Sequence, residues 1–140
     1  MEKLRRGNLP AETSSFIGRT RELAEVNDLL DRFPLVTVTG AAGVGKTRLA
    51  LTVAAGRPCP DGVWVAELSA ERNPAMLPLI VSAVLGLAEQ TVRPQEEVLV
   101  EYLAGKRLLL VLDTCEHLRD ACADLAERIL AAAPGGRILA

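Results

Sequence analysis

The stretch "GAAGVGKT", residues 40–47, places three glycines, a lysine and a threonine inside an otherwise hydrophobic part of the chain. The apolar run "LVTV" (35–38) precedes it, and the amphipathic run "RLALTVAA" (48–55) follows it. A glycine-rich loop between a strand and a helix is the setting in which such loops bind phosphate groups. The stretch therefore predicts an α/β fold that holds a phosphate site between a strand and a helix.

Each fixed position of this loop has a physical reason. The pattern G-x-x-x-x-G-K-[ST], the Walker A motif, is met at Gly40, Gly45, Lys46 and Thr47. Glycine permits backbone angles that side chains block, so successive N–H groups can turn toward an anion, and the following helix adds its positive end. Lys46 is expected to reach the β- and γ-phosphates as the catalytic residue, and the Thr47 hydroxyl to coordinate Mg²⁺. The alternative is a strand-to-helix turn with a purely structural role.

The predicted nucleotide contacts of the loop share its backbone and the first turn of the helix. They are Gly40, Ala41, Ala42, Gly43, Val44, Gly45, Lys46, Thr47 and Arg48.

A second motif follows later in the chain. The run "RLLLVLD" (107–113) is apolar until it ends in Asp113. A P-loop nucleotide site needs an acidic residue at the end of a neighbouring strand to hold magnesium, the Walker B role. An aspartate in this place could instead cap the next helix. With the phosphate loop upstream, we predict that Thr47 and Asp113 are the magnesium ligands.

Helical and strand patterns alternate along the whole chain. We expect helices at 19–32, 46–55, 73–85, 94–105 and 118–133, and strands at 35–39, 62–68, 107–113 and 135–140. This alternation predicts a three-layer α/β/α P-loop NTPase fold with a mainly parallel sheet. Residues 1–15 are polar and are expected to form a lead-in segment, and residues 16–140 to form the P-loop domain.

Composition excludes several classes of function. The formal net charge is −2, and the only basic block is Lys3, Arg5 and Arg6, so a nucleic-acid-binding face is not expected. The chain shows neither a signal peptide nor about 18 uninterrupted apolar residues, so we expect a cytoplasmic domain with no membrane contact. Cys115, His117 and Cys122 lie close in sequence but fit no common zinc signature, and structural roles are expected for them.

Five segments carry a family resemblance when taken in order. They are "NLPAETSSFIGRTREL", "LVTVTGAAGVGKTRLAL", "DGVWVAELS", "RLLLVLDTCEHL" and "RILA". This series resembles the nucleotide-binding region of STAND-class (NB-ARC-like) ATPases, in particular those of large bacterial transcriptional regulators of LuxR-type and SARP-type architecture. The resemblance covers about residues 8–140. It implies ATP or ADP as the nucleotide.

The resemblance also implies an adenine-side contact before the phosphate loop. Its F-x-G-R-x-x-E segment corresponds to Phe16, Ile17, Gly18, Arg19 and Glu22, of which Ile17, Gly18 and Arg19 are predicted cofactor contacts. A turn followed by a helix N-terminus would account for the same residues without a ligand.

The chain departs from the resembling family in two places. Thr114 follows Asp113 where relatives carry Asp or Asn, and Glu116, a weak candidate for a catalytic base, comes two residues later. Relatives also continue past "RILA" into a Thr-Ser-Arg segment with a sensor arginine, a helical lid and a winged-helix domain. We therefore expect a domain truncated after its fourth strand, with that strand at the centre of the sheet and an exposed edge beside the P-loop strand.

These observations support a nucleotide-dependent switch module of a regulator that acts in transcription. The expected partners are the nucleotide and other domains of a longer protein, with no direct DNA binding by this segment. Slow ATPase activity is left open. The alternatives are a self-sufficient P-loop ATPase or small-molecule kinase, and a truncated relic without enzymatic activity.

Overall fold

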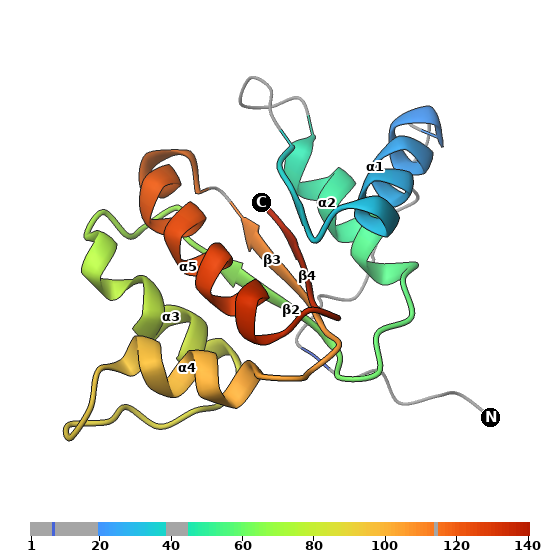
Figure 1. Ribbon diagram of the computed structural model, residues 1–140. Coiled ribbons are helices and arrows are strands. Elements are labelled where there is room, and N and C mark those ends of the chain that lie inside the picture. The colour runs from blue at the N-terminus through green and yellow to red at the C-terminus, as the bar shows by residue number, and fades with distance from the viewer. Residues whose placement is uncertain (1–6, 8–19, 39–44, 114) are drawn as a thin grey trace.

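The computed structural model describes residues 7, 20–38, 45–113 and 115–140. Strands and helices alternate through these residues (Figure 1). The elements are α1 (Thr20–Arg32), β1 (Leu35–Val36), α2 (Lys46–Ala55), β2 (Val63–Glu67), the 3₁₀ turn η1 (Pro74–Met76), α3 (Leu77–Val84), α4 (Gln95–Leu103), β3 (Leu109–Asp113), the 3₁₀ turn η2 (Glu116–Leu118), α5 (Arg119–Ala132) and β4 (Arg137–Leu139).

The four strands form one parallel sheet in the order β1-β4-β3-β2. The last strand in sequence therefore lies between β1 and β3, which confirms its predicted central place. β2 and β3 pair over five positions, from Val63 opposite Leu109 to Glu67 opposite Asp113. Because both strands run in the same direction, these two acidic residues lie side by side at the carboxyl edge of the sheet.

Helices cover both faces of the sheet, as predicted. Alternate residues of β3 point to opposite sides: Leu109 and Val111 pack in one buried cluster with α1 and α2, and Leu110 and Leu112 in another with α3, α4 and α5. Figure 1 shows the same division, with α1 and α2 on one side of the sheet and the other three helices on the opposite side. The continuous apolar run of this strand is explained by burial on both faces.

Several boundaries differ from the expected ones. The helix expected at 73–85 divides into η1 and α3. Asn73 accepts a hydrogen bond from the Ala75 N–H at 3.1 Å and so begins the 3₁₀ turn. Pro78, in the first turn of α3, has no N–H to continue an α-helical hydrogen bond back to residue 74. The missing hydrogen bond at Pro78 accounts for the division of the predicted helix at this place.

The strand expected at 35–39 is assigned only at Leu35–Val36. Its pairing with the last strand nevertheless continues, because the Val38 N–H donates to the Ala140 carbonyl at 2.8 Å. Within the described residues β1 is an edge strand, and Leu35 is exposed there. Among the described residues, the side of β1 away from β4 has no strand partner.

The N-terminal segment touches the opposite edge of the sheet at one described residue. Gly7 forms an isolated parallel bridge with Val63 at the start of β2. A Cβ at Gly7 would lie 1.6 Å from the Val63 carbonyl oxygen, so only glycine permits this close approach. Across the described part of the chain, no helix is long and apolar enough to cross a membrane.

Replacing Leu110 by Ala should destabilise the protein by about 2–5 kcal/mol, because the side chain is fully buried in the central sheet. Urea unfolding followed by circular dichroism measures the loss. Val92→Ala is the matched control, since Val92 is 91% exposed and its truncation should cost less than about 0.5 kcal/mol. Equal stabilities of the two variants would contradict the central, doubly covered position of β3.

Candidate functional site

α2 begins directly after the glycine loop and has no side-chain cap. Gly45 precedes the helix with φ 84° and ψ 26°, in the left-handed region that favours glycine. It has no side chain with which to cap the helix, and the first turn contains no acidic residue. The positive end of the helix dipole favours an anion at this place.

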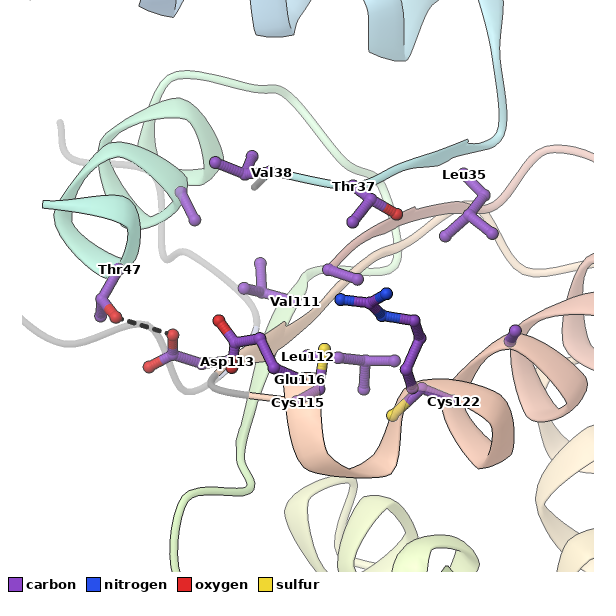
Figure 2. Close-up of a pocket in the computed structure, with 14 residues that line it drawn as sticks. Leu35, Thr37, Val38, Thr47, Val111, Leu112, Asp113, Cys115, Glu116 and Cys122 are labelled. Atoms are coloured by element: carbon purple, nitrogen blue, oxygen red, sulfur yellow. Dashed lines mark hydrogen bonds between the residues drawn. The ribbon is translucent and has the colours of Figure 1, made fainter. Parts of the chain in front are cut away.

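The carboxyl edge of the sheet faces this helix end. Asp113, half-buried, closes β3, and the Thr47 hydroxyl donates a hydrogen bond to its Oδ1 at 2.8 Å (Figure 2). The two residues are 66 positions apart in sequence. The fold thus joins the predicted magnesium ligands. Asp113 does not cap a helix, since Cys115 precedes η2 and Leu118 precedes α5.

Glu67 lies next to the candidate site and was not among the residues predicted from the sequence. It ends β2 directly opposite Asp113 in the register of the sheet. Its Oε1 also accepts the Ser69 N–H at 2.8 Å. Burial alone would raise the pKa of Glu67, but hydrogen bonds from Asp113, from the hydroxyl and N–H of Ser69 and from the Leu68 N–H outweigh it and lower the pKa. An acidic residue at the end of the strand pattern "GVWVAEL" was the signal that could have identified it.

Glu116 adds an acidic side chain from the turn after β3. It begins η2, is exposed, and extends toward Asp113 in Figure 2. The acidic residues near Asp113 therefore come from two different elements, β2 and the turn η2 after β3.

A cavity of about 130 Å³ adjoins Thr47 and Asp113. Apolar side chains form most of its wall, including Leu35, Val111 and Leu112. Small-molecule sites usually enclose about 300–1,000 Å³, so this cavity is too small for a nucleotide. Its lining also includes the oxygen-bearing side chains of Thr47, Asp113 and Glu116.

Two thiols line the same cavity. A hydrogen bond with Cys122 lowers the pKa of Cys115 to about 7, against the opposing effects of burial and of the charges on Glu116 and Asp113. The same hydrogen bond, together with burial, raises the pKa of Cys122. A thiolate that accepts a hydrogen bond from a neighbouring thiol is stabilised, which accounts for the opposite directions of the two shifts.

His117 contacts a different part of the chain. The His117 Nε2 contacts the Glu71 carbonyl oxygen at 2.5 Å and so links the turn after β3 to the loop after β2. Within the described ranges, no group of three or more His, Cys, Asp or Glu residues could hold a metal ion.

Several predicted contacts lie outside the described residues. They are Phe16, Ile17, Gly18, Arg19, Gly40, Ala41, Ala42, Gly43 and Val44. Of the remainder, Glu22 and Arg48 are exposed on α1 and α2, and Lys46 is the first residue of α2. The structure thus brings Gly45, Thr47 and Asp113 to one edge and does not test the other predicted contacts.

Comparison with known proteins identifies a family. The model of a family described as "AAA ATPase domain" matches residues 15–139, nearly the whole chain.

Individual relatives come from mycobacteria. A Mycobacterium tuberculosis protein named "Putative HTH-type transcriptional regulator" is 38% identical over 112 residues, which is 80% of this chain and 13% of the relative. A Mycobacterium bovis protein with the same descriptive name matches equally. An M. tuberculosis protein named "Uncharacterized protein" is 38% identical over 128 residues, 90% of this chain and 33% of the relative. The chain thus spans a small part of each of these relatives.

Alkylation of Cys115 by iodoacetamide should reach half its maximal rate near pH 7, because only the thiolate reacts and its fraction rises as pH passes the pKa. Cys122→Ala removes the stabilising hydrogen bond and should shift this midpoint upward, toward about 8.5. Peptide mapping by mass spectrometry measures the rate at each pH. Cys59→Ala is the control and should leave the Cys115 midpoint unchanged; an unchanged midpoint in Cys122→Ala would refute the thiol pairing.

Proposed function

This chain belongs to the AAA ATPase domain family, and on that premise we propose that it binds ATP and ADP with Mg²⁺ as the nucleotide-dependent switch module of a transcriptional regulator. The hydrogen bond between Thr47 and Asp113 carries the proposal. It joins a hydroxyl in the first turn of α2 to a carboxylate at the end of β3. Hydroxyl and carboxylate oxygens are ligands that Mg²⁺ prefers.

The residues present fit a bound Mg·nucleotide. Thr47 and Asp113 would hold the metal ion, which neutralises phosphate charge when it is bound. The N–H groups of Gly40–Thr47 would surround the phosphates, and Lys46 would add a positive charge to the β- and γ-phosphates. Arg48, which follows Thr47 in α2, would be a further contact of the nucleotide. Ile17, Gly18 and Arg19 would contact the adenine side.

The switch role rests on the relatives and on the sequence of the site. Proteins that match this chain carry the name of HTH-type transcriptional regulators and are several times longer than the matched region. The linked segments from "FIGRTREL" to "RILA" favour the STAND-class, NB-ARC-like subgroup. In such an arrangement this module binds nucleotide while other domains of the longer protein contact DNA.

Slow hydrolysis is part of the proposal. Thr114 follows Asp113, so the residue next to the metal ligand offers no carboxylate to polarise the attacking water. Phosphoryl transfer depends on positioning and charge stabilisation. Without a carboxylate to polarise the water, we expect hydrolysis to be slow and the nucleotide to stay bound. Rapid turnover by the chain alone would favour a self-sufficient ATPase.

Replacing Lys46 by Ala should weaken the binding of a fluorescent ADP analogue by about ten- to a hundredfold, because a hydrogen bond to a charged group contributes about 1.5–3 kcal/mol. A fluorescence titration with Mg²⁺ measures both affinities. Lys106→Ala is the control: Lys106 lies 4.6 Å from the ring centre of Tyr102, at the opposite edge of the sheet, and should not affect binding. Absence of Mg²⁺-dependent binding below about millimolar nucleotide by the wild type would defeat the proposal.

Mg·ADP should raise the melting temperature of the wild type, because a ligand that binds only the folded state stabilises it by about 2.7 kcal/mol at 100 times its dissociation constant. Differential scanning fluorimetry with and without Mg·ADP measures the shift. In Asp113→Asn, the part of the melting-temperature shift that depends on Mg²⁺ should be mostly lost. A wild type that melts identically in both conditions would support a relic without nucleotide function.

A further inference from the structure

Two acidic residues end neighbouring strands at the carboxyl edge of the sheet. Glu67 and Asp113 occupy paired positions of β2 and β3, so their side chains leave the same face of the sheet. Asp113 also accepts the Thr47 hydroxyl at 2.8 Å. Three oxygen-bearing side chains from three elements therefore converge beside the first turn of α2.

Neighbouring carboxylates favour a cation between them. Their negative charges repel each other, and a divalent cation held by both relieves this repulsion. The sheet register pairs Glu67 with Asp113, so the two side chains start from neighbouring backbone positions at the carboxyl edge. The arrangement thus favours occupation by a cation.

We propose that Glu67 supplies the second negative charge that holds the divalent cation of the nucleotide, together with Asp113 and the Thr47 hydroxyl. The inference rests on the proposed function and extends its metal site by one residue. Mg²⁺ is usually held by one or two carboxylates together with waters and substrate phosphates, so a site with two protein carboxylates is sufficient.

A structural role for Glu67 in the turn after β2 is the competing explanation. Its Oε1 accepts the Ser69 N–H at 2.8 Å, which could by itself account for the position of the side chain. Glu67→Gln separates the two roles. The amide keeps a carbonyl oxygen for Ser69 and removes the negative charge.

The test measures metal binding directly, with Mn²⁺ as the probe. Free Mn²⁺ is quantified by electron paramagnetic resonance in the presence of saturating ADP, and binding of a fluorescent ADP analogue is measured separately in EDTA. Glu67→Gln should lower the affinity of the ADP complex for Mn²⁺ by about 10–100-fold, the usual effect of removing a supporting group at a metal site. Metal-free ADP affinity should be unchanged.

Glu89→Gln is the matched control. Glu89 is exposed in the loop between α3 and α4, so its loss changes the net charge equally without altering the site. Glu67→Gln and Glu89→Gln with equal Mn²⁺ affinities would overturn the inference while leaving the proposed function intact. A wild type that binds no nucleotide in either medium would instead overturn the proposed function, and this inference with it.

Labelling of the wild type gives a second measurement that needs no variant. Carbodiimide modification of Glu67, mapped by mass spectrometry, should be suppressed by Mg²⁺ with ADP and not by ADP in EDTA. Modification at the same rate in both media would contradict a role for this carboxylate in holding the metal.

Discussion

The hydrogen bond from Thr47 to Asp113 is the contact on which the site depends, because it fixes the end of α2 against the end of β3. Its geometry results from packing elsewhere. β3 is buried on both faces, and this packing holds its carboxyl end in one position at the edge of the sheet. α2 packs over the same strand through Leu49 and Val53, which places its first turn at that edge. The polar contact is therefore positioned by an aliphatic core.

Basic and acidic residues lie on opposite sides of this contact in the sequence of its elements. The N-terminal end of α2 carries Lys46 and Arg48 in sequence, while the strand ends opposite carry Glu67 and Asp113. A positive helix end and a pair of carboxylates offer separate places for an anion and a cation. A nucleotide with its metal ion contains both charges. The same arrangement would be unfavourable for either ion alone, because each would face an unbalanced charge of its own sign.

Much of the fold could be predicted from sequence because its signals are local. The apolar run that ends in Asp113 predicted a strand covered on both sides, and the glycine loop predicted the strand-to-helix transition before α2. Pro74 and Pro78 changed the helix type between them, which helical periodicity does not reveal. The central place of β4 was predicted from a family resemblance, because a short apolar run does not indicate which strands it will pair with.

The site was predicted in part for a similar reason. Thr47 and Asp113 belong to motifs with a known spacing, and the fold joined them. Glu67 was not predicted, because its position next to Asp113 depends on the register between β2 and β3. The sequence of one strand does not contain this long-range information. The closeness of Cys115 to Cys122 likewise depends on how the turn η2 leads into α5, which residue type alone could not indicate.

Anomalous diffraction from crystals of the chain grown with Mn²⁺ and ADP tests the central claim most directly, since it locates the metal ion without reference to activity. The account predicts a single strong peak at the carboxyl edge, within about 2.6 Å of an oxygen of Thr47 or Asp113 or bridged to it by one water. Bound ADP with no peak at that edge, and with the hydrogen bond between Thr47 and Asp113 unchanged, would contradict it.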